Sequence, residues 1–349
     1  MTTRIEDYIR ETPARLQDIC SGAPALFAEV AVGPWTRIIV TGSGTSYHSA
    51  AQMEQAMREA SGLDVRAAYP FAVTEELIGD GAGTLMIGIS QDGGSLSTLA
   101  ALELGKRTGC AIATMCGREG AVLDKVADHV LTVAVGPETA GAKTKGFYGT
   151  KLNLLLLAQA IGRSNGTLTD EDAAAADAAL EAAIARFDGV CDTAEAWVRA
   201  HLSEFAATRD LRFVGPASLY GDTLEVALKT LETLRVPVTA YEFNEFIHGI
   251  YNAITEDSCI VLFDDGTEPR VETMASVLKE WTQHVHVIGS VQREHTDLFL
   301  GDVPNDGYET FAFPIAGQLI SALVPWEKGY DPATPKDPTF HDRLASKDR

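Results

Sequence analysis

The chain contains the same pattern twice, about 170 residues apart. Residues 37–47 read RIIVTGSGTSY and residues 211–221 read LRFVGPASLYG. In each, an apolar run ends at a glycine and is followed by serine and tyrosine, which is typical of a strand, a loop and the start of a helix. A repeat of this length is too long for a solenoid and indicates duplication of a whole domain.

Further apolar runs alternate with helical segments in both halves. In the first half they span residues 36–40, 84–89, 110–115 and 129–135, and in the second half residues 211–215, 258–263, 284–289 and 309–313. This alternation is typical of a parallel sheet covered by helices on both faces. We therefore predict an α/β protein with two tandem doubly wound parallel-sheet domains related by internal duplication.

The length of 349 residues suits two domains of the usual ~100–200 residues each. We expect a first domain with an N-terminal helix over residues 1–165 and a second domain over residues 210–328. Residues 166–209 are alanine-rich and predict connecting helices, over about 169–185 and 193–207. Residues 329–349 are rich in proline and polar residues and predict a tail that lies over the surface.

The chain is strongly acidic, with 28 Lys+Arg against 49 Asp+Glu and a net charge of −21. Such a field repels nucleic acid and anionic lipid, so a small anion binds only where local donors are aimed at it. No stretch approaches the roughly 20 apolar residues of a membrane span. The five cysteines lack metal-ligand spacing, and we expect reduced thiols in a cytoplasmic protein with neither nucleic acid nor membrane as a partner.

Two polar loops are candidates for anion binding. Gly42-Ser43-Gly44-Thr45-Ser46 places glycines and hydroxyls at a helix start, where backbone N–H groups and the helix dipole attract an anion. A turn and cap without a ligand is the alternative. A nicotinamide-binding loop is disfavoured, because Tyr47 stands where its third glycine would be.

The second polar loop reads Ser90-Gln91-Asp92-Gly93-Gly94-Ser95 and also leads into a helix. Ligands of open α/β sheets lie at the carboxyl ends of strands. The two loops can therefore close on one anion.

The second half contains candidate reactive residues. Glu225, Lys229 and Glu232 lie at i, i+4 and i+7 on one helix face, a pattern that on its own is usual for a solvated salt-bridge face. His248 precedes Gly249 and follows Glu245 at helical spacing. His284 and His286 lie two apart on a strand and face the same side, but no third ligand accompanies them, which favours packing or surface roles over a metal pair.

The two polar loops, together with residues 138–145 followed by Gly-Phe, resemble the sugar isomerase (SIS) family. This family has a flavodoxin-like fold and includes the isomerase half of glucosamine-6-phosphate synthase and its stand-alone deaminase and deglycase relatives. The resemblance extends from about residue 36 to residue 326. It implies that a sugar phosphate is held by the positions that match the family's phosphate site, Ser46, Ser90, Gln91 and Ser95, with Thr45 touching the sugar.

Two residues depart from the family pattern. Asp92 stands where the family usually has a hydroxyl, and Lys143 where it has a small residue. A carboxylate beside a phosphate costs about 1 kcal/mol or more unless a cation offsets it. Our hypothesis is that Asp92 and Lys143 pair across the pocket mouth and change substrate choice; the alternative is two solvated charges that never meet.

The resemblance also assigns catalytic roles. Glu232 would move a proton between C1 and C2 of an opened sugar, Lys229 would polarise an oxygen or hold the glutamate ionised, and His248 would assist ring opening. Lys347, with Lys336 second, matches a lysine that forms a Schiff base in some relatives, although a surface tail without a role is an equal alternative.

Several reactions fit these residues. A sugar-phosphate isomerase, an aminosugar-phosphate deaminase and a fructosamine-phosphate deglycase would use the same base, and we expect no glutaminase activity. A non-catalytic sugar-phosphate-binding regulatory protein is the alternative, and a dehydrogenase is a distant third. The resemblance implies neither a metal nor an organic cofactor, and suggests a homodimer in which the His248 loop completes the neighbour's site.

Overall fold

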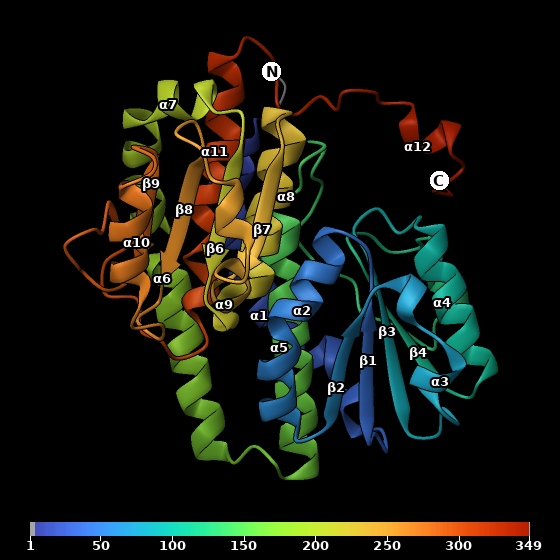
Figure 1. Ribbon diagram of the computed structural model, residues 1–349. Helices are drawn as coiled ribbons and strands as arrows, with labels where there is room; N and C mark the ends of the chain where they lie inside the picture. Colours follow the sequence, from blue (N-terminus) through green and yellow to red (C-terminus); the bar gives the residue numbers. More distant parts are fainter. Residues whose placement is uncertain (1–3, 349) are drawn as a thin grey trace. The chain divides into compact units, whose positions relative to one another are not determined.

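The structure, a computed structural model, describes residues 4–348 and contains two compact units (Figure 1). The first-sheet unit comprises Ala14–Glu138, Lys145–Ala178 and Lys336–Arg349. The second-sheet unit comprises Met1–Pro13, Thr139–Thr144 and Ala179–Pro335. Two long helices, α1 (Ile5–Phe27) and α6 (Asp170–Ala200), contribute residues to both units.

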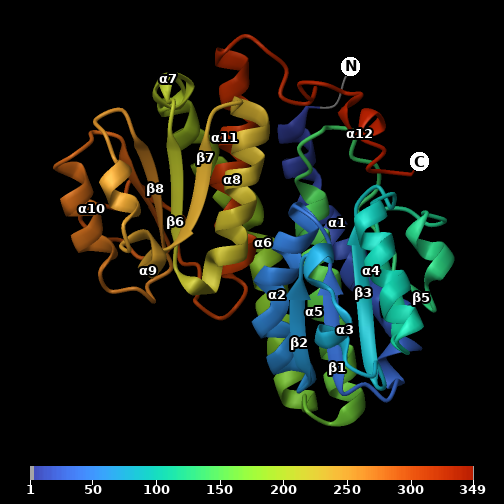
Figure 2. The ribbon, with the colours of Figure 1, turned by 45° about the vertical axis from the view of Figure 1, so that its right-hand side comes forward.

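The first-sheet unit contains five parallel strands in the order β2-β1-β3-β4-β5. In Figure 2, β1 lies between β2 and β3. The strands are β1 (Arg37–Thr41), β2 (Asp64–Ala68), β3 (Thr84–Ser90), β4 (Ala111–Cys116) and β5 (His129–Val130). The helices of this unit are α2 (Thr45–Ser61), α3 (Glu75–Ile78), α4 (Leu96–Arg107), α5 (Lys145–Asn165) and α12 (Phe340–Arg343).

The second-sheet unit repeats this topology. Its strand order, β7-β6-β8-β9-β10 when read from the corresponding edge, places the first strand of the unit between the second and the third, as in the first sheet. The strands are β6 (Leu211–Gly215), β7 (Val238–Glu242), β8 (Cys259–Asp264), β9 (Val285–Gly289) and β10 (Leu298–Phe299). The helices are α7 (Leu202–Ala207), α8 (Tyr220–Leu234), α9 (Phe243–Phe246), α10 (Val271–Lys279) and α11 (Pro314–Glu327). The predicted fold class is confirmed.

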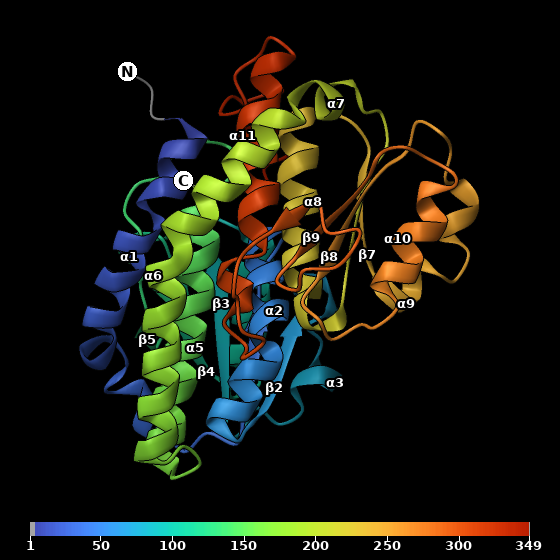
Figure 3. The ribbon, with the colours of Figure 1, turned by 90° about the vertical axis from the view of Figure 1, so that its left-hand side faces the viewer.

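The second sheet is covered on both faces, with α10 on one side and α8 and α11 on the other (Figure 3). Strand β8 is buried along its whole length. Its Ile260 and Leu262 pack in one apolar cluster with Met274 of α10, whereas Phe263 contacts Phe213 and Phe313. Because successive side chains of a strand point to opposite faces, one apolar run supplies both layers of the core.

Three sequence predictions of secondary structure were wrong. Residues 309–313 form a 3-10 helix, Glu309–Phe311, and not a strand, because the Glu309 carboxylate accepts the amides of Asp306 and Gly307 in a turn and Pro314 then begins α11. A short buried apolar run does not distinguish a strand from a helical turn. Residues 129–135 pair as a strand only at His129–Val130. The connecting region is helical as predicted, but the predicted division was wrong, because α6 continues through residues 185–193 and is followed by the short α7.

None of the helices among residues 4–348 combines the length and apolar character needed to cross a bilayer.

Helices α8 and α11 pack closely in the second-sheet unit because Gly317 has no side chain. A Cβ atom added at Gly317 would lie 2.5 Å from Cβ of Val226. We predict that Gly317→Ala lowers the free energy of unfolding by about 1–3 kcal/mol through overpacking. Gly189→Ala, in the interior of α6 with nothing within 4 Å of the added Cβ, is the matched control and should raise it by about 0.5–1 kcal/mol. Urea unfolding of both variants measures the two signs, and equal effects would contradict the packing argument.

Candidate functional site

The two anion-binding loops lie at one edge of the first sheet. Strand β1 pairs in parallel with β2 on one side and with β3 on the other, and the loops that follow β1 and β3 leave from the same carboxyl edge. The chain continues to β2 on one side of β1 and then to β3 on the other. Ligands of doubly wound sheets bind at such a change of direction in the strand order. The helices α2 and α4 begin directly after these loops, so their N-termini point positive dipole ends at the edge.

The first loop is tightly built around its glycines. A Cβ atom at Gly42 would lie 2.6 Å from Cβ of Ser46 and 3.0 Å from the carbonyl oxygen of Ile89. Gly44, the residue before α2, has a φ of 56°, which favours glycine. The backbone can therefore turn sharply and begin α2 with Thr45 and Ser46 in its first turn.

The second loop is fixed by a helix cap and by close packing. The Ser95 hydroxyl accepts a hydrogen bond from the amide of Thr98 at the start of α4. The side chain of Gln91 packs against Gly117 and against Gly146 in the first turn of α5, where added Cβ atoms would lie 2.5 and 2.8 Å from it. The loop thus has a defined shape in which Ser90, Gln91 and Ser95 lie between β3 and α4.

The C-terminal tail contacts the second loop. The amide of Asp348 donates to the carbonyl of Gly94 at 2.9 Å, and the amide of Leu96 donates to the carbonyl of Ser346 at 3.3 Å. The Lys347 ammonium donates to the Asp92 carboxylate at 3.0 Å. Both charged side chains are partly exposed, so the ion pair contributes about 0–1 kcal/mol, and its clearest effect is to bring a cation to the loop.

Lys143, the other departure from the family pattern, belongs to the second-sheet unit. Its proposed pairing with Asp92 stays a prediction. The structure assigns Asp92 a cation that the sequence hypothesis did not name for that role, Lys347. The Schiff-base role of Lys347 stays a prediction.

The corresponding loops of the second sheet carry carboxylates. Asp264 ends β8 and Asp265 follows it, as Ser90 ends β3 and Gln91 follows it in the first sheet. Asp264 accepts from the Arg293 guanidinium at 2.6 Å, and Asp265 accepts from the hydroxyl of Ser218, which follows β6. This edge of the second sheet is therefore unsuited to a phosphate.

Helix α8 presents the predicted glutamate–lysine set. The Lys229 ammonium is 2% exposed, lies 2.7 Å from Oε2 of Glu232 and lies 3.8 Å from Oε1 of Glu225. Glu225 is fully buried, whereas 38% of the Glu232 side chain is exposed. A buried ammonium needs partners of opposite charge, so the pair of carboxylates holds Lys229 in place and Lys229 in turn fixes one oxygen of Glu232.

His248 lies on an exposed loop after β7. The Glu242 carboxylate caps the short helix α9 by accepting the amides of Asn244 and Glu245 at 2.8 and 3.0 Å. The His248 amide donates to the carbonyl of Glu245, and Gly249 has a φ of 105°, a left-handed value that turns the chain directly after the histidine.

The structure does not bring Glu232 and His248 together within one chain. Glu232 lies in the last turn of α8, just before β7 begins, and His248 follows α9 at the end of β7. A five-residue strand spans roughly 17 Å, so the two side chains lie at opposite edges of the second sheet.

Sequence reasoning missed a cluster beside His284 and His286. Oε1 of Glu204 lies 2.8 Å from Nδ1 of His284 and 2.9 Å from Nε2 of His286. Burial raises the pKa of the Glu204 carboxyl, but hydrogen bonds from His286 and His284 outweigh burial and lower the pKa to about 2. The two-residue histidine spacing was the one signal in the sequence, and the carboxylate comes from about 80 residues away.

The contact between the tail and the second loop yields a prediction. A Cβ atom at Gly94 would overlap the carbonyl oxygen of Asp348. We predict that Gly94→Ala releases the tail, so the amides of Leu96 and Asp348 exchange with solvent faster, as measured by hydrogen-exchange NMR. Lys347→Met should have a smaller effect because it removes only an exposed ion pair. Gly22→Ala, with nothing within 4 Å, is the control, and unchanged exchange in Gly94→Ala would contradict the docked tail.

Comparison with known proteins identifies the family. Residues 34–160 match the model of the SIS domain. A solved Clostridium difficile 630 protein, described provisionally as a phosphosugar isomerase, is 44% identical, with 99% of each chain covered and a TM-score of 0.96. A provisionally described sugar-binding protein from Salmonella typhimurium LT2 is 36% identical, covering 91% of this chain and 99% of its own, with a TM-score of 0.83.

Among curated proteins, the glutamine–fructose-6-phosphate aminotransferase of Clostridium acetobutylicum is 26% identical over 353 residues, which cover 97% of this chain and 55% of that protein. The chain thus spans about half the length of this curated relative. The 44% identity over nearly the full length of a solved relative and the match to the family model lead to one conclusion. The chain belongs to the sugar isomerase (SIS) domain family.

Proposed function

We propose that the chain is an enzyme that moves a proton between neighbouring carbons of an opened sugar phosphate or amino-sugar phosphate, with Glu232 as the base. The observation that carries this proposal is the contact of 2.7 Å between the buried Lys229 ammonium and Oε2 of Glu232. A base must be held in place and must also be reachable. Lys229 holds Glu232 in place, and the exposed part of Glu232 makes the carboxylate reachable.

The first-sheet loops support the phosphate part of the proposal. They combine two helix N-termini with the hydroxyls of Thr45, Ser46, Ser90 and Ser95 and the amide of Gln91. These groups are hydrogen-bond donors without charge, and helix N-termini favour anions. Their presence explains how a chain with a net charge of −21 would bind a phosphate ester. Lys347 offsets the one carboxylate in the loop, Asp92.

Three reactions share the proposed step. Aldose–ketose isomerisation, deamination of an amino-sugar phosphate and cleavage of a fructosamine phosphate each begin with removal of a proton from a carbon beside a carbonyl or imine. The descriptions of the relatives as a phosphosugar isomerase and as a fructose-6-phosphate aminotransferase point to the same chemistry. The proposal therefore defines the step and the base, and a panel of substrates identifies the reaction.

Proton exchange tests the base directly. In D₂O, the wild-type chain should incorporate deuterium at C1 or C2 of fructose-6-phosphate, glucosamine-6-phosphate or a fructosamine-6-phosphate, as followed by NMR. We predict that Glu232→Gln slows this exchange by at least ~100-fold because it removes the base, while substrate still raises the melting temperature. Glu280→Gln, at an exposed glutamate after α10, is the matched control.

Each outcome of this experiment is informative. Wild-type exchange rates in Glu232→Gln would contradict the assigned base. Stabilisation of the wild-type chain by all three ligands without any exchange would contradict the enzyme and favour a non-catalytic sugar-phosphate-binding regulatory protein.

We further propose that the active form is a homodimer in which His248 acts in the site of the partner subunit. The separation of Glu232 and His248 along β7 supports this proposal, because one chain cannot direct both side chains at one sugar. The surface beside His248 also supports it. Ile247, Tyr251, Val277 and Trp281 are each about 40% exposed and line a groove of about 370 Å³. An apolar groove of this kind is typical of a surface that a second copy covers.

Mixing two inactive variants tests the shared site. We predict that Glu232→Gln and His248→Ala each abolish turnover, and that a mixture refolded together recovers about a quarter of wild-type activity. Random pairing makes half of the dimers mixed, and each mixed dimer contains one intact site. No recovery, in a sample shown to contain mixed dimers, would contradict the contribution of His248 to the partner's site.

A further inference from the structure

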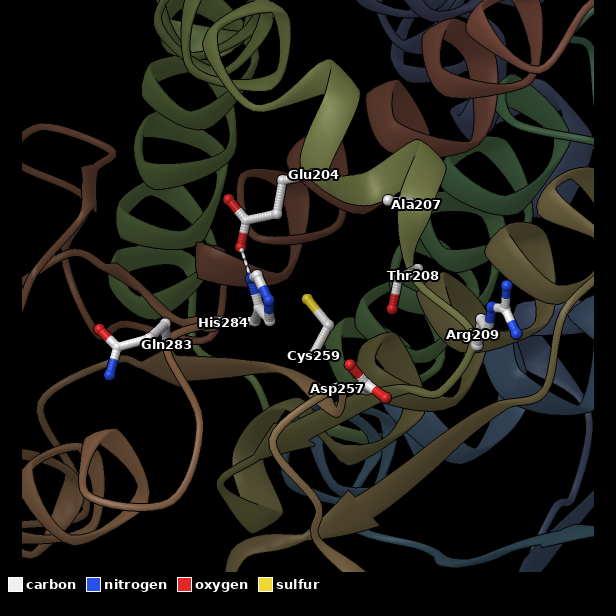
Figure 4. Close-up of a pocket in the computed structure, with 8 residues that line it drawn as sticks. All are labelled: Glu204, Ala207, Thr208, Arg209, Asp257, Cys259, Gln283 and His284. Carbon is white, nitrogen blue, oxygen red and sulfur yellow. Dashed lines mark hydrogen bonds and ion pairs between the residues drawn. The ribbon is translucent and has the colours of Figure 1, made fainter.

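A polar pocket opens at the amino edge of the second sheet. Its volume is about 680 Å³. Its walls come from the residues that precede or begin three neighbouring strands, β6, β8 and β9, and from α7, and Figure 4 shows the side chains that line it. His248 lies at the opposite, carboxyl edge of the same sheet, so this pocket is separate from the groove beside His248.

Three different metal-binding side chains converge beside this pocket. A carboxylate oxygen of Glu204, the sulfur of Cys259 and a ring nitrogen of His286 all lie within 4.8 Å of one another. They come from α7, from the first residue of β8 and from the second residue of β9. In Figure 4 the Cys259 sulfur points toward the region where the Glu204 carboxylate and His284 lie. Packing of the apolar core does not by itself bring an oxygen, a sulfur and a nitrogen donor together.

We propose that Glu204, Cys259 and His286 form a transition-metal site that prefers zinc. Zn²⁺ binds carboxylate oxygen, thiolate sulfur and imidazole nitrogen at about 2.0–2.3 Å in tetrahedral geometry. Donor atoms around such an ion lie about 3–4 Å apart, so atoms already within 4.8 Å need only small movements. Binding releases the thiol proton of Cys259 to solvent, and the thiolate becomes the ligand. A mixed sulfur and nitrogen set disfavours Mg²⁺ and Ca²⁺, which prefer oxygen donors.

The surroundings hold these donors in place. The His286 ring packs against Trp197, His201 and Phe205, with ring centroids 4.9–5.4 Å away. Its Nε2 already points at Glu204, while its buried Nδ1 has no hydrogen-bond partner among the described residues. Among the described residues, the hydrogen bond of this buried ring to Glu204 is therefore the one that a metal would replace. Cys259 is also buried and is one of the residues that line the pocket.

His284 has a different role in this site. Its Nδ1 holds the same oxygen of Glu204 at 2.8 Å, but His284 lies outside the group of mutually close donors and is partly exposed. It is a positioning residue that orients the carboxylate, as residues behind metal ligands commonly do. The three-residue set leaves a fourth tetrahedral position for water or a small ligand from the pocket.

Metal titration of the full chain tests the site. After treatment with a chelator, the wild-type protein should bind one Co²⁺ per chain with a thiolate-to-cobalt charge-transfer band in the near ultraviolet, and Zn²⁺ should displace the cobalt. Cys259→Ser should lose the band, and His286→Gln and Glu204→Gln should weaken Zn²⁺ binding at least tenfold. Cys191→Ser, at another buried cysteine of this unit, should keep both the band and the stoichiometry.

Two variants, Glu204→Gln and His284→Gln, keep the test decisive. Glu204→Gln preserves size and hydrogen-bonding capacity on a partly exposed helix, so it reports on binding even if Cys259→Ser does not fold. His284→Gln should keep the charge-transfer band and weaken binding by less than tenfold. Less than one metal per wild-type chain, or a band that survives Cys259→Ser, would overturn the proposed site; a band lost in His284→Gln would overturn the three-residue set.

Discussion

The rest of the structure depends on one constraint. In each unit, the first strand lies between the second and the third and pairs in parallel with both. Because β1 pairs with β2 on one side and β3 on the other, the chain leaves β1 and β3 at one edge. That edge collects loops, hydroxyls and helix N-termini. The same constraint separates Glu232 from His248 in the second unit. Helix α8 returns the chain to the amino edge, where β7 begins, so Glu232 lies at that edge. His248 follows the end of β7 and lies at the carboxyl edge.

The glutamate–lysine set of α8 shows how burial can position a group that must stay accessible. An unpaired ammonium in the position of Lys229 would be costly by several kcal/mol, and two carboxylates offset this cost. Of these, Glu225 is fully buried, whereas Glu232 reaches solvent. The asymmetry in exposure, not the charge pattern, distinguishes the proposed base from its neighbour.

Sequence reasoning succeeded where a pattern is local. Strands β1, β3, β4, β8 and β9 are buried on both faces and stand out as apolar runs, and their predicted bounds lie within one or two residues of the observed ones. The edge strands β2 and β7 did not stand out, because β2 alternates between exposed and buried residues and β7 is mostly half-buried. Hydrophobic periodicity is weak in such short strands.

In the candidate site, too, local contacts could be predicted from the sequence and long-range contacts could not. The spacing of Lys229 and Glu232 on one helix face is local, and the structure confirms that these side chains meet. The contact of Lys347 with Asp92 and that of Glu204 with His284 and His286 join residues about 255 and about 80 positions apart. No local spacing encodes such contacts, because they depend on how a tail or a connecting helix packs onto a sheet.

The carboxylates at the carboxyl edge of the second sheet bear on how many anions one chain can bind. Asp264 and Asp265 stand at the strand position that in the first sheet provides Ser90 and Gln91, and both are occupied by contacts inside the protein. A duplicated domain of this kind need not duplicate its ligand, because the second copy has two engaged carboxylates where the first has uncharged hydrogen-bond donors. In the proposed enzyme, the first copy would hold the phosphate and the second would supply the base, so two copies of one fold would divide recognition and chemistry between them.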